Sequence, residues 1–281
     1  MKMNRTVSFI VIALIYIAAA AVGVVTYMAL PYAMWLKLLI ADTAATVFTF
    51  IFSVIFRNAS VYDPYWSVQP MVIAAAFAIG KSMTLPRVLM LTAIMCWGAR
   101  LTANWAYTFH GMAHQDWRYT MLHEKTGVFY PIINFVGIHM VPTLVVYGCV
   151  LPAVEVIESA AKGNVLSMVF FALAMAAVLL QGTADYQMQS FRKQRSGGFI
   201  RTGLWKHSRH PNYLGEIVMW WSVALMAIAA LGFEWRLIVG AVANTLLFLC
   251  VSIPLADGRQ SRKEGFEEYK EQTRMLLPIR K

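Results

Sequence analysis

Charged residues are scarce in this sequence. Only 14% of its 281 residues are Asp, Glu, Lys or Arg, whereas 59% are hydrophobic. A soluble domain could not hide that much apolar surface, so the composition predicts a polytopic integral membrane protein. The net charge of +10 would suggest nucleic-acid binding in a soluble chain. In a membrane protein, cationic loops beside the spans account for it, and we expect no nucleic-acid partner.

Residues that build metal sites and disulfides are also few. The three cysteines, Cys96, Cys149 and Cys250, lie in apolar runs without disulfide or zinc spacing, which indicates small core residues. His110 and His114 have the i, i+4 spacing of some metal sites, but six histidines in all are too few for a membrane di-iron centre. We therefore expect no metal site.

The nucleotide-binding motif of soluble dehydrogenases is missing as well. No G-x-G-x-x-G occurs, and no segment between the apolar runs is long enough for a βαβ unit. A Rossmann domain is therefore excluded, and helix ends and loops would have to hold any nucleotide.

Long apolar runs predict an all-α bundle of about seven to eight transmembrane helices. The third run is short and could be tilted or re-entrant. We divide the chain into N-terminal helices over residues 1–60 and a second domain over 61–281. The runs cover about 7–29, 36–57, 67–80, 87–109, 129–151, 165–189, 212–231 and 235–255.

Lys and Arg concentrate in the segments that lie on the same side of the membrane as the N-terminus. The positive-inside rule then places both termini in the cytoplasm, and we expect the bacterial inner membrane. The loops around Asp63, Asp116–Tyr119 and Arg192–Asn212 would open on that same side, together with the C-terminal tail. They could form one site.

The stretch from Gly203 to Glu216 joins a basic loop, with Arg209 and His210, to an apolar helix that Pro211 can start. A helix N-terminus offers free N–H groups and a positive dipole end, which favour phosphate or carboxylate. Asn212 and Glu216 share one face of this helix. A carboxylate in an apolar span is a functional candidate by default. The alternative is the cationic flank of an ordinary membrane helix.

A second polar stripe lies on the sixth span. The polar residues of this stripe are offset only slightly around the helix, so they share nearly one face. That face should point to a water-filled cavity or another polar helix. The alternative is a structural contact between Asp185 and Arg192. The stripe comprises Gln181, Asp185, Gln189 and Arg192. Asp42, Arg100 and Asn104 are further polar groups inside spans and could pair with one another.

Two loops add candidate groups. Asp63 lies between Tyr62 and Tyr65, and a carboxylate beside a phenol is a plausible proton-delivery pair, although Asp-Pro is also a common turn. In the segment 110–119, Arg118 could pair with a phosphate, and Trp117 or Tyr119 could stack on a base. Aromatic residues next to cations are also the ordinary membrane belt.

The stretch GLWKHSRHPNYLGE, an apolar helical hairpin, Gly-Phe-Glu-Glu-Tyr269 and Leu-Leu-Pro278 together resemble the steroid 5α-reductase-like membrane proteins, in particular their bacterial DUF1295 branch. The similarity runs from about Asp63 to Pro278. It implies NADPH held between loops and helix ends on the cytoplasmic side. It also implies reduction of a carbon–carbon double bond conjugated to a ketone, in a lipophilic and possibly steroid-like substrate.

By this resemblance, Tyr62-Asp63 is nearest to the family's Gln-Glu pair, with a shorter acid. The family's substrate-protonating tyrosine has no clear counterpart, although Tyr107 is nearby. The expected catalytic set is therefore Asp63, Tyr62, Tyr65 and Tyr107. The expected cofactor-binding set is Arg118, Tyr119, Asp185, Gln189, Arg192, Arg209, His210, Asn212, Tyr213, Glu216, Arg259 and Tyr269.

The main alternative is an S-adenosylmethionine-dependent membrane methyltransferase of the isoprenylcysteine or phospholipid type. Such proteins share the Arg-His-Pro-x-Tyr helix start. They usually carry a Glu-Glu pair before the later glycine, but here Glu267 and Glu268 follow Gly265. This difference, together with Asp185 and Arg192, favours the reductase. A small transporter is a further alternative, but no internal repeat supports it. We expect a lipophilic small-molecule substrate and membrane lipids as partners.

Overall fold

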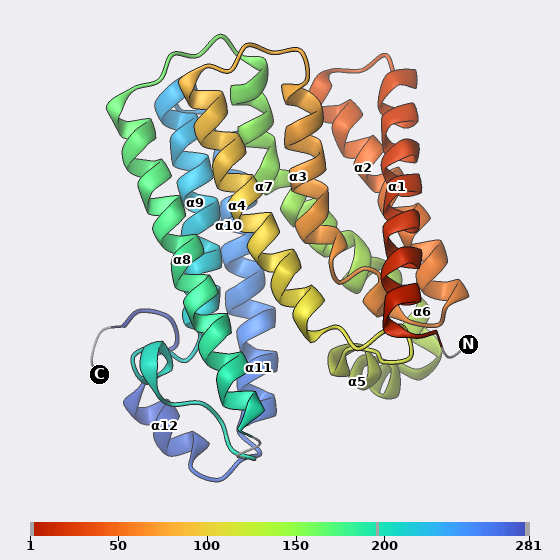
Figure 1. Ribbon diagram of the computed structural model, residues 1–281, viewed down its shortest axis with the longest axis vertical. Helices are drawn as coiled ribbons and strands as arrows, with labels where there is room; N and C mark the ends of the chain where they lie inside the picture. The colour runs from red at the N-terminus through yellow and green to blue at the C-terminus, as the bar shows by residue number, and fades with distance from the viewer. Residues whose placement is uncertain (1–2, 195–196, 279–281) are drawn as a thin grey trace.

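The computed structural model describes residues 3–194 and 197–278, and these ranges contain helices and no strand (Figure 1). This confirms the predicted all-α membrane bundle without a Rossmann domain. The long elements are α1 (Arg5–Ala29), α2 (Met34–Ile55), α3 (Tyr65–Ala78), α4 (Leu85–Thr108), α7 (Val141–Glu158), α8 (Val165–Lys193), α9 (Pro211–Leu231) and α10 (Arg236–Leu247). The short ones are η1 (Ala59–Val61), α5 (Trp117–Thr126), η2 (Gly127–Phe129), α6 (Tyr130–Ile132), η3 (Ile133–Met140), η4 (Gly203–Lys206), η5 (Phe248–Ser252), α11 (Ile253–Gln260) and α12 (Phe266–Gln272).

Six of the described helices are long and apolar enough to cross a membrane, so the predicted count of seven to eight is not confirmed. Two of the predicted spans are not long or apolar enough to meet this criterion: α3, with 14 residues, and α4. α4 carries Arg87 and Arg100, which lower its hydropathy. Most of the first half of α4 is buried inside the bundle, where its polar groups find partners in the protein. The six spans are Arg5–Ala29, Met34–Ile55, Trp117–Glu158, Val165–Lys193, Pro211–Leu231 and Arg236–Gln260.

The rods alternate in direction, and both ends of the chain lie at the lower end of the bundle in Figure 1. The loops that follow α2, α4, α8 and α11 are at this same end, as the charge pattern predicted. Which side of the membrane it faces stays a prediction, as does the division at residue 60. α1 stands at one edge of the bundle, beside α2.

Two stretches of wider, π-helical turn end two residues before a proline. η3 precedes Pro142 and η5 precedes Pro254. Proline cannot donate the usual helical hydrogen bond and clashes with the preceding turn, so a local π adjustment lets a membrane helix continue through it.

The core lies where α4, α7, α8, α9 and α10 meet, around Trp97 and Trp220. Two glycines set the closest helix approaches. A Cβ on Gly240 would lie 2.0 Å from the backbone of Gly148, so α10 touches α7 directly. A Cβ on Gly215 would lie 2.5 Å from the Gln181 side chain, so α9 packs tightly against the polar stripe of α8.

Candidate functional site

Arg100 of α4 is the centre of a buried polar cluster that also contains Gln181, Asp185 and Glu216. Its Nη1 donates to Asp185 Oδ2 at 2.7 Å, and its Nη2 donates to Gln181 Oε1 and lies 3.5 Å from Glu216 Oε2. The predicted stripe on α8 therefore faces a cation on α4. Asp42 is not part of this cluster, so the suggested pairing of Asp42 with Arg100 is wrong.

Glu216 is 5% exposed and has further donors. The indole Nε1 of Trp97 lies 2.9 Å from both carboxylate oxygens, and Trp220 Nε1 donates to Oε1 at 2.9 Å. Two indoles and one guanidinium thus compensate a charge that would otherwise be costly at this depth. Trp220 lies one helical turn after Glu216, so both groups share a face of α9.

Asn212 continues this cluster towards the lower end of the bundle. Its side chain interacts with the Asp185 carboxylate, while its Oδ1 is buried without a partner among the described residues. Gln189 donates to Asn104 Oδ1 at 3.4 Å, across α8 and α4. Asp185, Asn212 and Glu216 therefore lie in one cluster, as predicted, and Arg100 joins the two carboxylates.

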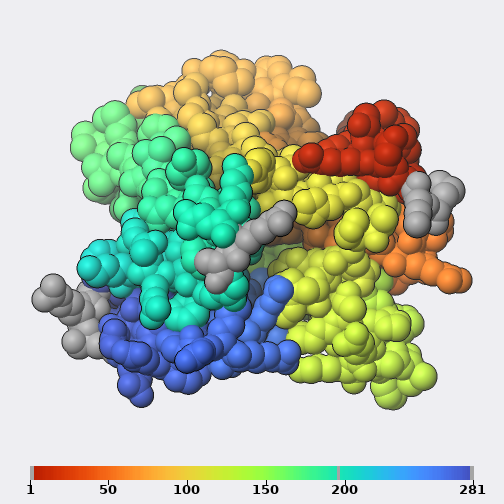
Figure 2. All heavy atoms as spheres, turned by 60° about the horizontal axis from the view of Figure 1, so that its bottom comes forward, coloured from red at the N-terminus to blue at the C-terminus, as the bar shows by residue number. Residues whose placement is uncertain are grey.

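Three arginines from three elements act on Tyr213, at the start of α9, or on one another, and we call Arg118, Arg192 and Arg259 the arginine group. Arg118 and Tyr213 are within electrostatic range of each other, as are Arg192 and Tyr213. Arg192 and Arg259 act on each other as like charges. Figure 2 shows the lower end, where the C-terminal segment lies against the residues that follow α4.

The members of the arginine group have different partners. Arg118 forms an ion pair with Asp116 at 2.8 Å and is partly exposed. The Arg259 guanidinium carbon lies 4.1 Å from the centre of the Trp117 ring. Within residues 3–194 and 197–278, neither Arg192 nor Arg259 forms an ion pair. Two neighbouring cations without a direct counter-charge favour an anion between them.

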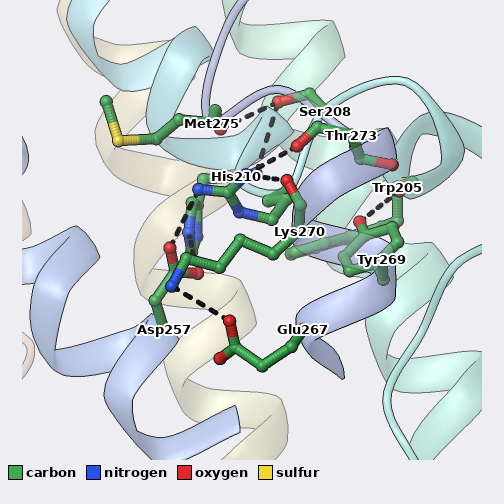
Figure 3. Close-up of polar contacts among 10 residues, drawn as sticks. Trp205, Ser208, His210, Asp257, Glu267, Tyr269, Lys270, Thr273 and Met275 are labelled. Atoms are coloured by element: carbon green, nitrogen blue, oxygen red, sulfur yellow. Dashed lines mark hydrogen bonds and ion pairs between the residues drawn. The ribbon is translucent and has the colours of Figure 1, made fainter. Parts of the chain in front are cut away.

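Arg209 and His210 hold the C-terminal tail. Arg209 Nη2 donates to Asp257 Oδ2 at 3.0 Å, and its Nη1 donates to the carbonyl of Thr273 at 2.6 Å. His210 Nε2 lies 2.9 Å from Asp257 Oδ1, as Figure 3 shows. We call these contacts the tail latch.

Tyr269 belongs to the same latch, since its hydroxyl donates to the carbonyl of Trp205 (Figure 3). The His210 ring stacks on Tyr213 with 5.2 Å between centroids. Arg209, His210 and Tyr269 therefore make structural contacts that the sequence did not predict. Their expected role as cofactor ligands stays a prediction.

Asp63 lies at the lower end and accepts a hydrogen bond from the Tyr119 hydroxyl at 2.5 Å. Burial raises the pKa of Asp63 to about 6, although Arg118 and the bond from Tyr119 act in the opposite direction. This carboxyl group therefore changes its protonation near neutral pH. A phenol beside such a group is suited to moving a proton.

The predicted partners of Asp63 are elsewhere. The Tyr62 hydroxyl is 2.7 Å from Thr143 Oγ1, and the Tyr65 hydroxyl donates to Asp42 Oδ1 at 3.5 Å. Tyr107 is 53% exposed beside Lys193. The proposed pairing of Asp63 with these phenols is wrong, because the rings of Tyr62 and Tyr65 stack on each other and their hydroxyls bind Thr143 and Asp42. A catalytic role for these tyrosines stays a prediction.

Three important residues escaped sequence reasoning: Trp97, Trp220 and Asp257. Their signals were present but weak. Trp97 precedes Arg100 by three positions, and Trp220 follows Glu216 by four, so each indole shares a helix face with a charged residue. Asp257 is an acid inside the last apolar span, which is itself an indication of a buried partner.

The family described as "Protein of unknown function (DUF1295)" matches residues 49–273, which is most of the sequence. The chain belongs to the DUF1295 family. This confirms the predicted branch, whereas the broader likeness to steroid 5α-reductases is not confirmed. The match includes the polar cluster, the arginine group and the tail latch, and it begins within α2.

An uncharacterized protein of Schizosaccharomyces pombe is similar to this DUF1295 member. The two are 25% identical over an alignment of 206 residues, and the match covers 62% of this chain and 59% of the yeast protein. No solved structure matches the chain.

Proposed function

We propose that this DUF1295 protein binds NADPH at its lower end and reduces a carbon–carbon double bond conjugated to a ketone in a lipophilic substrate. The arginine group carries the proposal. Arg118 of α5 and Arg192 of α8 are within electrostatic range of Tyr213 at the N-terminus of α9, and Arg259 of α11 is within range of Arg192. Such a site suits a ligand with several phosphates, because charge-assisted bonds to Arg are strong and the helix end adds a favourable dipole.

Two polar atoms of the buried cluster on α8 and α9 fit the less charged part of such a ligand. Asn212 Oδ1 is a buried acceptor without a partner among the described residues, and Gln181 Nε2 is a buried donor without one. A buried polar atom that lacks a partner is costly, so a ligand amide that supplies the complementary groups would be stabilised there. Asp185 and Glu216 share the single positive charge of Arg100 and would position these groups.

When bound, the nicotinamide supplies a hydride to the β-carbon of the enone. The protein then has to polarise the ketone and provide a proton. The hydroxyl of Tyr119 is suited to donate to the ketone oxygen, and Asp63 is suited to resupply the proton because its pKa is about 6. The apolar surface of the bundle lets a lipophilic substrate approach from the bilayer.

Binding of nucleotides to the purified full chain tests the proposal. We expect NADPH to bind at least tenfold more tightly than NADH, because an arginine can pair with the 2′-phosphate. Arg192→Ala and Arg259→Ala should each weaken NADPH binding by roughly 10- to 100-fold, at about 1.5–3 kcal/mol for a charge-assisted bond.

Arg236→Ala is the matched control, because Arg236 lies at the upper end in a pair with Glu234. It should leave the dissociation constant unchanged. Calorimetry that shows binding of S-adenosylmethionine and none of either nicotinamide would overturn the reductase in favour of the methyltransferase. An equal loss of affinity in the Arg236 variant would remove the arginine group from the site.

A further inference from the structure

A cavity lies between α1, α2 and α3, and no member of the arginine group lines it. Its volume is about 440 Å³, within the usual range for small-molecule sites. It follows α3 from Tyr65 to Ile79, which is roughly 20 Å at 1.5 Å per helical residue. The cavity is therefore long and narrow.

The cavity opens sideways towards the lipid. Val24 of α1, Val72 of α3 and Ile79, which directly follows α3, line it and are also exposed on the outside of the bundle, by 57%, 44% and 80%. Its inner end is closed by Tyr16 and Tyr65, whose rings meet edge to face at 5.5 Å.

Asp42 gives this otherwise apolar cavity an unusual charge. Its carboxylate accepts from Gln69 Nε2 at 2.6 Å and from the Tyr65 hydroxyl at 3.5 Å. Across the part of the chain that the structure describes, no Lys, Arg or His pairs with it. The other two ionisable lining groups, Lys81 and Glu158, neutralise each other at 2.9 Å. A carboxylate inside a span without a cation is costly and marks a ligand or ion site.

The remaining polar and aromatic groups complete a site for a cation. Gln69 also lines the cavity, is 7% exposed, and its Oε1 has no partner among the described residues. Tyr16, Tyr27, Tyr65 and Phe77 supply aromatic rings, which attract ammonium groups. Tyr27 already does so, since the Lys37 ammonium lies 4.3 Å from its ring centre.

We propose that the cavity between α1, α2 and α3 binds a lipophilic amine, with the ammonium group at Asp42 and Gln69 and a single aliphatic chain along α3. An ammonium is preferred to a neutral hydroxyl because it offers three donors and a full positive charge to acceptors that lack a cation. This site is separate from the proposed nucleotide seat and does not depend on it.

Photolabelling of the full chain in phosphatidylcholine nanodiscs tests this inference. The probe is a dodecylamine that carries a diazirine near the end of its chain, at a pH where the amine is protonated. Unlabelled dodecylamine and dodecanol compete with it. We expect labels on α1 and α3, and competition by the amine at about tenfold lower concentration than by the alcohol, which corresponds to 1.4 kcal/mol.

Three variants test separately whether binding needs the Asp42 carboxylate and whether it needs the space of the cavity. Asp42→Asn keeps the size of the side chain and should remove the preference for the amine. Ala20→Phe fills the cavity and should abolish labelling, whereas Ala21→Phe places the same ring on the exposed face of α1 and should not. Nucleotide binding by each preparation reports separately on the proposed NADPH seat.

Equal competition by amine and alcohol, or an amine preference that survives Asp42→Asn, would overturn the proposal. So would equal labelling of the Ala20 and Ala21 variants. If Asp42→Asn fails to fold, the comparison between these two variants still decides whether the cavity is the binding site.

Discussion

Replacing Arg100 with Met should strongly destabilise the protein. The substitution keeps an unbranched side chain of similar length but removes the cation between Asp185 and Glu216. Two carboxylates from α8 and α9 would then face each other in the interior. The indoles of Trp97 and Trp220 and the amides of Gln181 and Asn212 lie near them, and Arg192 also acts on Asp185.

Breaking a buried ion pair from one side costs about 3–5 kcal/mol. The Arg100 side chain retains 15% of its exposure, so we expect the lower part of this range. At about 2–4 °C for each kcal/mol in domains of comparable size, the melting temperature should fall by roughly 6–12 °C.

Tryptophan fluorescence during heating in a mild detergent measures this change. The matched control is Arg236→Met, because Arg236 is 40% exposed in its pair with Glu234 and such pairs contribute about 0–1 kcal/mol. A double variant with Glu216→Gln should recover part of the loss, since it removes one uncompensated charge. The coupling between the two sites should be about 1–3 kcal/mol.

A melting temperature for Arg100→Met within about 2 °C of the parent, or equal to that of the Arg236 variant, would refute the reasoning. It would mean that water reaches the cluster freely and screens its charges. The absence of coupling with Glu216 would place the cost of the substitution in packing.

Three further predictions concern other parts of the chain. Burial raises the pKa of Asp63 above its unfolded value to about 6, so the folded state binds the proton more tightly than the unfolded state. The free energy of unfolding should therefore be highest below about pH 4 and decline as the pH rises towards 6. The decline should reach at most about 3 kcal/mol, and a pH series of thermal melts should show it disappearing in Asp63→Asn. Gly240→Ala should destabilise the protein by several kcal/mol, because α10 must move away from α7. Gly258 has open space around it, so Gly258→Ala should be neutral or slightly stabilising. Thermal melts of the two variants measure this difference. Arg209→Met should open the tail latch and speed tryptic cleavage after Lys263, and unchanged cleavage would show that the latch does not depend on the guanidinium.

Much of the fold could be predicted from the sequence, because apolar runs and their cationic flanks follow directly from the bilayer. The eight runs correspond to helices, and the loops with Asp63, Arg118 and Arg209 lie at one end. The number of spans was less predictable. α3 and α4 are helical, yet their length and hydropathy reflect packing inside the protein more than contact with lipid.

The polar stripe of α8 was predictable because helical periodicity places Gln181 and Asp185 on one face. Its partner was not, since any of several intramembrane charges could have faced it. Only the packing of α4 against α8 shows that Arg100 does so.

Pairings between residues close in sequence were the least predictable. Asp63 neighbours Tyr62 and lies near Tyr65, but in the irregular turn around η1 these side chains diverge, and its partner is Tyr119. In the same way, a basic loop before a helix gives no indication that Arg209 reaches the backbone of Thr273. Such contacts depend on the path of the tail.

The tail latch also imposes an order on biosynthesis. Arg209 waits for Asp257, 48 positions later, and for Thr273, 64 positions later. At roughly 5–20 residues per second, the ribosome needs about 3–13 s to supply them. During that interval Arg209, just before α9, lacks its contacts with Asp257 and Thr273. In a stalled or truncated chain the loop before α9 would therefore stay accessible to membrane proteases.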